Sequence, residues 1–410
     1  MGKSIIASKN QPLVSRRAFV QRSGAGILGL GLGALSSATA CHAEETGNDT
    51  FAIIHGPVVQ SPGPGEVTVT WHTNRNASSK VLYGTDGQLD HTAVTSRDGL
   101  IPNDSTCHAV RLTGLTPGKP FQYRLVSREF KGYITPYVVN HGETVESEVF
   151  TCTPLDPAKE YFSFVMWNDI HDDSRRLEAM FNDISWDGVD FVVLNGDILN
   201  DFVAHERFFI AFYDSCARKF GAALPMVFVR GNHETRGPWA RRFLDFVPGR
   251  EGRPYYAFDH GGVHFLALDS GEDKPDDNKE YAGLVEFASF REAQTAWLRA
   301  DLESEAARNA RYRIVLSHQP PAPVGCDGFG CQEVRRLWRP LVNAAGARLW
   351  LSGHTHDFAW CKPGEDGDNV FHAMTNPPDA TVRVDVAPEA LKVTVLQKGG
   401  EVLHRETIPA

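Results

Sequence analysis

Two kinds of hydrophobic pattern divide the chain. From residue 51 to residue 153, short segments alternate apolar with polar side chains, as in EVTVTWHT (66–73) and KVLYG (80–84), and turn-forming residues separate them. Helical spacing does not appear in this stretch of sequence. Because alternation with a period of two is typical of half-buried β-strands, we expect a small all-β sandwich here.

From residue 160 onward, nearly continuous apolar runs alternate with helix-like stretches. Continuous apolar character over so few residues is typical of strands that are buried on both faces. The runs lie at 161–167, 191–194, 225–229, 264–268, 313–316 and 348–351. Helical spacing lies between them at 175–184, 206–220, 291–306 and 333–345. This alternation predicts a layered α/β domain, in which ligands bind beyond the carboxyl ends of the strands.

The last part of the chain returns to an alternating pattern. Segments 381–386 and 391–396 read as strands, and a Pro-Glu turn separates them. Since no linker precedes these segments, we expect them to extend the sheets of the α/β domain rather than to form a third domain.

The first 43 residues have the composition of an export signal. They contain five basic residues and no acidic residue. Paired arginines at 16–17 precede a Gly/Ala/Leu-rich run at 24–35, and small residues at 38–40 offer a cleavage site, which resembles a twin-arginine signal. The apolar run is too short and too rich in glycine to span a membrane. We therefore expect an exported protein of the periplasm or cell envelope, without a transmembrane span.

Charge and cysteine content narrow the expected partners. The formal net charge is −10, and loss of five basic residues with the signal would change it to −15. Such an acidic chain is poorly suited to a nucleic-acid polymer, which binds clustered Lys and Arg.

Cys41 would come first after cleavage, but a lipid anchor there is less favoured than simple cleavage because Ala38 is small. Cys326 and Cys331 would close a small loop in an oxidising compartment, and free thiols are the open alternative.

Five of the apolar runs are followed directly by residues that can bind metals. The motifs are Asn168-Asp169-Ile170-His171, Asn195-Gly196-Asp197, Arg230-Gly231-Asn232-His233-Glu234, Ser317-His318 and Ser352-Gly353-His354-Thr355-His356. One His or Asp at a strand end is usually a hydrogen-bonded cap, but five such ends are hard to explain by packing. Carboxylate, imidazole and amide oxygen suit Mn, Fe or Zn. The motifs supply seven candidate ligands, more than the four that one tetrahedral site uses. If one carboxylate bridges, the set divides evenly between two divalent or trivalent ions, with four ligands at each.

In this order, the motifs D-x-H, G-D, G-N-H-E, H and G-H-x-H resemble those of the calcineurin-like metallophosphoesterases, over about residues 160–375. The resemblance implies a four-layer α/β/β/α domain and two metal positions. The first position would be held by Asp169, His171, Asp197 and His356. The second would be held by Asp197, Asn232, His318 and His354, so that Asp197 would bridge the two ions.

The amino-terminal half extends the resemblance. The strand of Trp71, and that of Tyr123 after a Leu-Thr-Pro-Gly turn, resemble a fibronectin type III domain, and segment 255–270 resembles the purple acid phosphatases. We expect Trp71, Tyr123, His260 and His264 to serve packing rather than chemistry. The expected parts of the chain are a signal region at 1–43, a fibronectin-like sandwich at 51–153 and a metallophosphoesterase domain at 160–408.

The resemblance implies an exported dimetal phosphoesterase that hydrolyses a small phosphate mono- or diester. A hydroxide that bridges the two ions would attack phosphorus, and His233 would assist the transition state or the leaving group. Arg236 and Asn200 are candidate substrate contacts. The alternatives are a non-catalytic surface-binding protein built on the sandwich, and a protein phosphatase, because the string RGNHE appears at 230–234.

Two departures from the purple acid phosphatases change the expected chemistry. Asn200 stands where those enzymes have the tyrosine whose charge transfer to iron gives their colour, and His171 adds an imidazole that they lack. We therefore expect a colourless protein without an obligatory ferric ion. Protein phosphatases have an aspartate at the position of Asn200 that orients the catalytic histidine, and Asp201 is the neighbouring carboxylate here. Segment 319–333, rich in Pro and Gly, is either a substrate-selecting loop or an ordinary surface loop.

Overall fold

Strands in two sheets make up the amino-terminal part of the computed structural model, which describes residues 50–321 and 324–410. These strands are β1 (Ile53–Gly63), β2 (Glu66–Thr73), β3 (Ala77–Gly84), β4 (His91–Ala93), β5 (Cys107–Leu112), β6 (Phe121–Thr135), β7 (Val138–Glu146) and β8 (Phe150–Cys152). Trp71 and Tyr123 are buried in the cluster between the two sheets, which confirms the packing role expected for them. The export signal expected at 1–43 lies outside the described residues.

The rest of the described chain forms the layered α/β domain that the apolar runs predict. Its strands are β9 (Phe162–Trp167), β10 (Val189–Asn195), β11 (Met226–Val229), β12 (Tyr256–His260), β13 (Val263–Leu268), β14 (Tyr312–Ser317), β15 (Leu349–Ser352), β16 (Ala359–Cys361), β17 (His372–Thr375), β18 (Ala380–Val386), β19 (Ala390–Gln397) and β20 (Val402–Pro409). Its α-helices are α1 (Ser174–Met180), α2 (His205–Phe208), α3 (Asp214–Cys216), α4 (Phe243–Phe246), α5 (Phe287–Leu302), α6 (Glu305–Asn309), α7 (Phe329–Leu337) and α8 (Arg339–Ala344). Within the part of the chain that the structure describes, none of the helices combines the length and apolar character needed to cross a membrane.

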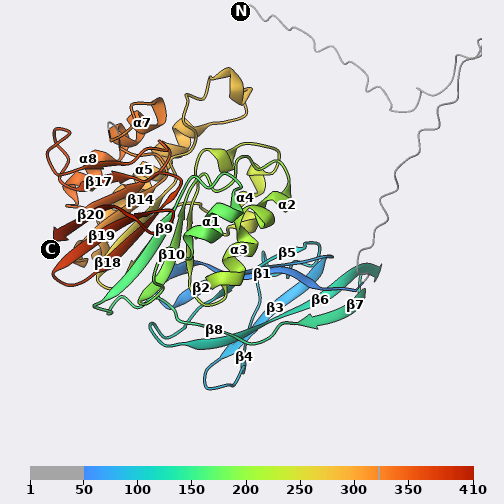
Figure 1. The fold of residues 1–410 in the computed structure, drawn as a ribbon. Coiled ribbons are helices and arrows are strands. Elements are labelled where there is room, and N and C mark those ends of the chain that lie inside the picture. The colour runs from blue at the N-terminus through green and yellow to red at the C-terminus, as the bar shows by residue number, and fades with distance from the viewer. Residues whose placement is uncertain (1–49, 322–323) are drawn as a thin grey trace, which may run out of the picture. The chain divides into compact units, whose positions relative to one another are not determined.

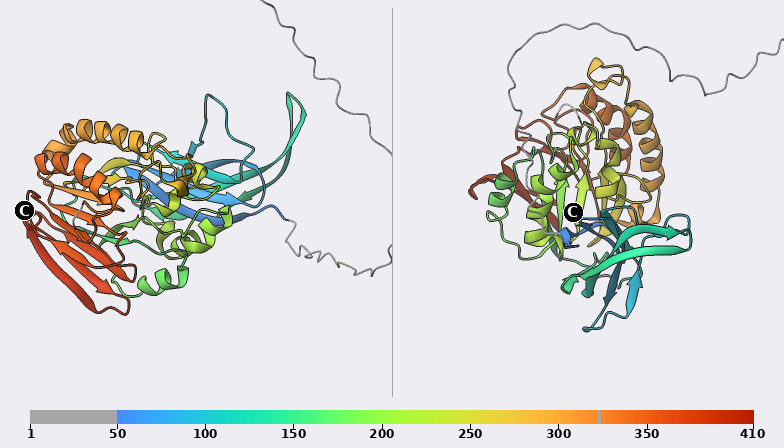
Figure 2. Two further views of the ribbon diagram at one scale, coloured as in Figure 1. Left: turned by 90° about the horizontal axis from the view of Figure 1, so that it is seen from above. Right: turned by 90° about the vertical axis from the view of Figure 1, so that its right-hand side faces the viewer.

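Two of the sheets pack face to face between two layers of helices. One sheet has the order β20-β19-β18-β9-β10-β11-β1-β2-β5, and the other has the order β12-β13-β14-β15-β17-β16. Aromatic side chains such as Phe164, Phe191 and Phe265 fill the core between them. Separate clusters attach α1–α4 to the first sheet and α5, α7 and α8 to the second. Figure 2 shows the green and orange helices on opposite sides of the sheets. The expected four-layer α/β/β/α architecture is confirmed.

The carboxyl-terminal strands extend the larger sheet, as expected. β18 pairs antiparallel with β9, with Val384 opposite Phe164, and β19 and β20 continue the sheet outward. Figure 1 shows these three red strands beside the green strands β9 and β10. The carboxyl-terminal part of the chain thus pairs, through β18, with β9, the strand that is followed by the first ligand motif.

The sandwich is not separate from the larger sheet, because β1 pairs in parallel with β11, with Gln60 opposite Met226. The alternation in segment 66–73 predicts a half-buried strand, yet all residues of β2 are buried. The polar face of β2 packs against the α/β domain instead of meeting water. Thr70 Oγ1 lies 2.9 Å from the hydroxyl of Tyr213, for example. The alternation therefore correctly predicts which face of β2 is polar and which is apolar. It does not predict which part of the protein packs against each face.

Two expected helices are more complex than their spacing predicts. The helix expected at 206–220 contains two π-helical turns, Phe209–Tyr213 and Ala217–Gly221. The helix expected at 333–345 is divided into α7 and α8, because Pro340 lacks the N–H that would continue the first helix. Cys326, in the loop before α7, and Cys331, in the first turn of α7, form a disulfide, which decides between the two alternatives left open by the sequence.

Substitution Tyr213→Phe tests the contact between the sandwich and the α/β domain. The buried hydroxyl of Tyr213 donates a hydrogen bond to the carbonyl oxygen of Thr70 at 2.8 Å. Because the substitution leaves that carbonyl without this donor, we expect the free energy of unfolding to fall by about 1–3 kcal/mol. Urea unfolding measures the loss, and Tyr137→Phe, at an exposed tyrosine, is the matched control. Equal midpoints for both variants would contradict the role given to Tyr213.

Substitution His264→Asn tests a buried charge cluster through its pH dependence. The ring nitrogens of His264 lie 2.8 Å from the carboxylates of Asp259 and Asp301. Burial lowers the pKa of His264, but the two carboxylates raise it to about 9, above the unfolded value of about 6.5. The stabilisation is therefore complete below about pH 6.5 and is lost as the pH rises through about 9. We expect unfolding experiments to show a larger loss of stability at about pH 6 than at about pH 10, and a pH-independent loss would refute the assignment.

Candidate metal centre

The loops that follow β9, β10, β11, β14 and β15 bring the sequence motifs together. β9, β10 and β11 are parallel neighbours, and β14 and β15 are also parallel, so their carboxyl ends lie at the same edge. Two groups of ligand atoms arise there, each with its atoms within 4.8 Å of one another. The first group is Asp169, His171 and His356, and the second group is Asp197, His318 and His354. The two histidines of the GHTH segment thus enter different groups.

The first group lies at the surface end of the site. Asp169 Oδ1 is 3.3 Å from His356 Nε2 and 3.7 Å from His171 Nε2. The two imidazole nitrogens are 3.1 Å apart. Asp169 is buried, whereas the histidines are partly exposed, so the group has a buried carboxylate and a side that is open to solvent.

The second group lies deeper and touches the first. His318 Nε2 is 2.9 Å from Asp197 Oδ2 and 3.9 Å from Asp169 Oδ1, so one buried imidazole contacts both carboxylates. Asn232 lies beside them, since the next residue, His233, donates its backbone N–H to Asp197 Oδ1 at 2.9 Å. The structure therefore brings six of the seven residues that the motifs predict into two adjacent groups, and Asn232 directly precedes a residue whose backbone N–H reaches Asp197.

Hydrogen bonds from the scaffold fix which atoms face the site. Asp169 Oδ2 accepts from the backbone N–H of His354 at 2.8 Å and from the amide of Asn168 at 2.7 Å, which leaves Oδ1 for the group. His318 Nδ1 donates to the carbonyl oxygen of Asn195 at 2.9 Å, which leaves Nε2 for the group. Each side chain is thus oriented by its second polar atom, as is common around metals.

The motifs have an unusual backbone conformation. Left-handed φ angles between 48° and 76° occur at Asp169, His171, Asp172, Asp197, His354 and His356. Asp and His adopt this region more readily than most residues, but each such position still costs on the order of 1–3 kcal/mol when the surroundings impose it. Such strain persists only where the surrounding structure holds it, and here it coincides with the two ligand groups.

Glycines in the motifs leave space for the carboxylates. A β-carbon at Gly231 would lie 2.2 Å from Asp197 Oδ1, and one at Gly353 would lie 2.5 Å from Asp169 Oδ2. Both distances are far below van der Waals contact. The backbone therefore approaches both carboxylates closely, and a side chain at either position would displace a carboxylate.

Glu234 is a residue of the site that sequence reasoning missed. Its fully buried carboxylate accepts backbone N–H groups of Asp197 and Gly231 through Oε2, and of Ile198 and Leu199 through Oε1, at 2.8–3.0 Å. Burial raises the pKa of Glu234, and the charge of Asp197 adds to the effect, while the four donors favour the ionised form. An acid directly after a ligand motif is the only signal that the sequence offers for this role.

The charges of the site are strongly coupled. Burial raises the pKa of Asp169, but the charge of His318 and contacts with the neighbouring imidazoles lower it overall. Burial lowers the pKa of His318, yet Asp197 and Asp169 raise it to about 10. Burial and the charge of His318 together lower the pKa of His354 to about 4. The site thus stabilises positive charge beside its carboxylates and keeps His354 neutral, the form that binds a metal.

His233 lies beside the first group and outside both. Its ring centroid is 4.7 Å from that of His171, and its Nε2 is 3.9 Å from Asp197 Oδ2. Its Nδ1 donates a hydrogen bond to the backbone carbonyl of Asn200, and Asp201 Oδ1 is 3.9 Å from the same nitrogen. The backbone at Asn200, rather than a side-chain carboxylate at that position, therefore orients the imidazole.

Arg236 is held beside His233 by two acids. Its Nη2 lies 2.9 Å from Glu272 Oε2 and 3.1 Å from Asp273 Oδ1, and its Nη1 lies 3.2 Å from His233 Nε2. The guanidinium is therefore an ion-paired group at the rim of the site, with one edge turned towards the imidazole.

The donor atoms fit metal ions. Asp169 Oδ1 and Asn232 Oδ1 are buried and, among the described residues, have no hydrogen-bond partner. An unsatisfied buried polar atom costs about 1–3 kcal/mol, so two of them in one site call for a compensating interaction. Carboxylate, imidazole and amide oxygen form the donor set that Mn, Fe and Zn accept.

Comparison with known proteins agrees with this geometry. Residues 162–358 match the Calcineurin-like phosphoesterase family, and residues 55–153 match the Purple acid Phosphatase, N-terminal domain. The purple acid phosphatase PPD1 from yellow lupin (Lupinus luteus) seeds is similar in structure, with a TM-score of 0.57, 16% identity and coverage of 86% of this chain and 74% of that one. The structure of PhoD gives a TM-score of 0.56 and 14% identity over 86% of this chain and 92% of that one. At such identities the two structures show the fold alone.

Curated relatives match a smaller part of the chain. Serine/threonine-protein phosphatase CPPED1 of Pongo abelii is 29% identical over 145 residues, and that of Homo sapiens is 26% identical over 145 residues. Each match covers 34% of this chain and 44% of the relative, so the chain spans less than half the length of the curated relatives it matches. With these matches, the strand order and the site, the chain contains a calcineurin-like phosphoesterase domain at residues 162–358, which follows a purple acid phosphatase N-terminal domain at residues 55–153.

Proposed function

We propose that the protein is a metal-dependent hydrolase of phosphoric esters with a centre of two metal ions. The observation that carries the proposal is the pair of adjacent ligand groups at the strand ends of a calcineurin-like phosphoesterase domain, linked by His318. When bound, two such ions acidify water and stabilise the charges of the attacking and leaving oxygens. The sandwich at residues 51–153 and the metallophosphoesterase domain at residues 160–408 are the domain limits of this proposal.

The seven ligands divide between the two ions. Asp169, His171, Asp197 and His356 hold the first ion, and Asp197, Asn232, His318 and His354 hold the second. Support for this division comes from the two ligand groups, which separate His354 from His356. Further support comes from Asn232 Oδ1, which is buried and has no hydrogen-bond partner among the described residues, while the backbone N–H of the next residue, His233, reaches Asp197. Mn, Fe and Zn are the ions that this donor set suits, and the absence of a tyrosine at Asn200 argues for a colourless protein.

His233 is the proposed proton carrier of the reaction. Because its Nδ1–H donates to the carbonyl of Asn200, Nε2 is the nitrogen that exchanges a proton with the substrate. A protonated Nε2 would donate to the leaving oxygen of the ester, a step that typically contributes about 10²–10⁴-fold to the rate.

Arg236 and Asn200 are the proposed substrate contacts. Glu272 and Asp273 form ion pairs with Nη2 of Arg236. Nη1 lies next to His233 and can donate a hydrogen bond to a phosphate oxygen. The exposed side chain of Asn200 stands on the same loop as the carbonyl that orients His233. The substrate class is therefore a small phosphate ester that binds between the metal ions and these two residues.

A second candidate, hydrolysis of phosphoprotein, is favoured by two observations. The relatives that match 145 residues of the chain carry the name Serine/threonine-protein phosphatase CPPED1. Asp201, 3.9 Å from His233 Nδ1, also supplies a carboxylate near the catalytic imidazole despite the asparagine at 200. Faster hydrolysis of a phosphoserine peptide than of small esters would favour this candidate. A non-catalytic surface-binding protein would hydrolyse neither substrate.

Export belongs to the proposal as well. Support comes from the amino-terminal sequence, with its paired arginines at 16–17, its apolar run at 24–35 and its cleavage site at 38–40. The disulfide between Cys326 and Cys331 agrees with an oxidising compartment such as the periplasm. Cleavage after residue 40 without lipidation of Cys41 is the form we propose.

Single ligand substitutions test the two-ion assignment. We expect Asn232→Ala and His171→Ala each to lower the bound manganese from about two equivalents to about one, because each removes a ligand of a different ion. Elemental analysis of the purified variants measures this, and His91→Ala, at an exposed histidine of β4, is the control that keeps both ions. Two equivalents retained in either variant would contradict the assignment.

Hydrolysis of model esters tests the activity and the role of His233. We expect the manganese-loaded protein to hydrolyse p-nitrophenyl phosphate or bis-p-nitrophenyl phosphate, and His233→Ala to lower kcat by about 10²–10⁴-fold with both ions still bound. A higher rate on the diester indicates an open site, and a higher rate on the monoester indicates a pocket for a dianionic phosphate. A phosphoserine peptide that reacts faster than both would favour the protein phosphatase. No turnover of any of the three with both ions bound would refute the proposed function.

A further inference from the structure

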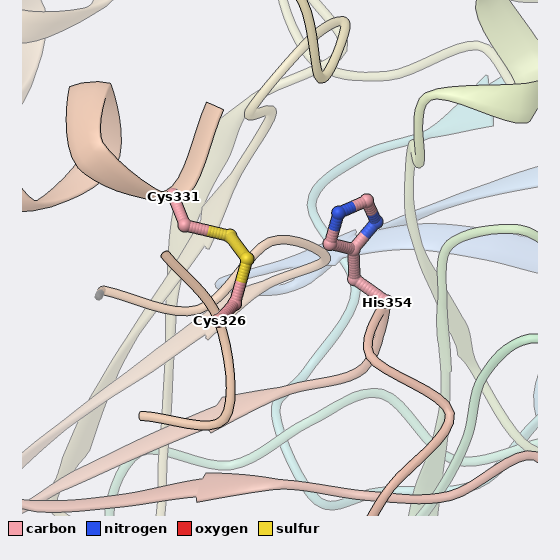
Figure 3. A group of neighbouring side chains, drawn as sticks. All are labelled: Cys326, Cys331 and His354. Carbon is pink, nitrogen blue, oxygen red and sulfur yellow. A yellow bond between two sulfur atoms is a disulfide. The ribbon is translucent and has the colours of Figure 1, made fainter. Parts of the chain in front are cut away.

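The disulfide in segment 319–333 lies beside the second ligand group. Cys326 and Cys331 have their α-carbons 6.3 Å apart. Their sulfur atoms and a ring nitrogen of His354 lie within 4.8 Å of one another. Figure 3 shows the disulfide and the imidazole of His354 facing each other, with Cys331 on a helix and His354 on a loop from another part of the chain. A sulfur pair and a nitrogen are thus already gathered at one place.

The scaffold holds both cysteines near His354 independently of the bond between them. Cys331 lies in the first turn of α7 and is buried. The neighbouring Gly330 donates its N–H to the carbonyl of Asp273 at 3.2 Å, and a β-carbon there would lie 1.7 Å from Gln319 Oε1. The start of α7 is therefore packed tightly against the residue that follows ligand His318.

The arm that carries Cys326 is held in a similar way. Val324 is buried in the core cluster that contains Trp350 of β15. A β-carbon at Gly325 would lie 3.1 Å from Thr375 Oγ1 and 3.6 Å from the methyl group of Thr355, the residue between the two histidines of the GHTH segment. Val324 thus anchors the chain two residues before Cys326, although Gly325 and Asp327 are exposed. With this anchor on one side and buried Cys331 on the other, we expect the sulfur of Cys326 to remain near His354 when the disulfide opens.

We propose that reduction of the Cys326–Cys331 disulfide creates a site for a soft divalent cation of the zinc and cadmium class, with His354 as the third ligand. In the disulfide, neither sulfur is a thiolate, and the thiolate is the form that binds metals. Two thiolates and one imidazole are ligands that zinc accepts, and the four residues between the cysteines fit the usual spacing of paired zinc ligands. The cysteine pair and His354 come from segments that are distant in the sequence, so the sequence alone does not show the site.

The redox step balances with an external dithiol as the reductant. The dithiol gives two electrons and two protons, its own sulfurs become a disulfide, and the protein disulfide becomes two thiols. Binding of the cation then releases the two thiol protons. The site therefore exists only in the reduced protein.

The position of His354 links this site to the second ligand group, since the same imidazole also belongs with Asp197 and His318. A cation held by the two thiolates engages this imidazole and weakens the second position of the two-ion centre. Reduction in the presence of a soft cation should therefore lower manganese occupancy there. The inference goes beyond the proposed function, because a cation bound by the thiolates is detected whether or not the protein hydrolyses an ester.

Cadmium titration of the full chain tests the proposal. Metal-free protein is compared in its oxidised form and after reduction with a phosphine, and a thiol assay should show two additional thiols after reduction. We expect the reduced form to bind Cd²⁺ more tightly than the oxidised form, with ultraviolet absorption from thiolate-to-cadmium charge transfer that saturates at about one equivalent. Affinity is compared rather than the total number of bound equivalents, because His354 is shared with the second ligand group. This comparison uses the wild-type chain, so it does not depend on whether a variant folds.

Variants identify the ligands. The double variant Cys326→Ser/Cys331→Ser should lose the tighter cadmium binding and its absorption, whereas Cys361→Ser, at a cysteine that is free in the structure, should keep both. His354→Ala should weaken cadmium binding by at least about tenfold in the reduced form. Equal cadmium binding by the oxidised and reduced chains, or an unchanged absorption in the double variant, would overturn the proposal. Unchanged affinity in His354→Ala would refute the histidine as the third ligand.

Discussion

The contact of one buried imidazole with two buried carboxylates is the interaction on which the site depends. His318 Nε2 lies 2.9 Å from Asp197 and 3.9 Å from Asp169, and all three side chains are buried. Two carboxylates removed from water cost several kcal/mol each unless positive charge and hydrogen bonds compensate them. Backbone N–H groups of His354 and His233 satisfy one oxygen of each acid. The oxygens that remain are the atoms for which a metal centre supplies the missing charge.

The fold can hold this arrangement because the strands that carry it are buried on both sides. The core between the two sheets and the two outer clusters surround β9, β10, β14 and β15 with packed apolar side chains. Left-handed backbone at residues such as Asp169 and Asp197 costs on the order of 1–3 kcal/mol each, an amount that a core of this size offsets. Glu234 adds to the support, since its carboxylate gathers four N–H groups of the loops after β10 and β11. Rigid strand ends and shared acids thus place the ligand side chains before any ion binds.

Much of the site could be predicted from the sequence, because its signals are local. An apolar run gives a buried strand, parallel strands end at one edge, and a polar motif after each run must therefore lie near the others. The assignment of His354 and His356 to different metal positions came from the family resemblance and stays a prediction, and the two histidines lie in different groups of side chains in the structure.

Features that depend on contacts between distant segments could not be predicted. The pairing of β1 with β11 and the burial of the polar face of β2 depend on what packs against these strands, which alternation does not reveal. The hydrogen bond from His233 to a backbone carbonyl at residue 200 is independent of the side chain there. The approach of Cys326 and Cys331 to His354 likewise depends on how α7 packs against Gln319.

Anomalous X-ray diffraction from crystals of the manganese-loaded protein tests the central claim most directly. The account predicts two manganese peaks roughly 3.5–4 Å apart, one against His171 and His356 and one against Asn232 and His318, with Asp197 in contact with both. A single peak at this edge of the sheets, or two peaks that do not share Asp197, would contradict it.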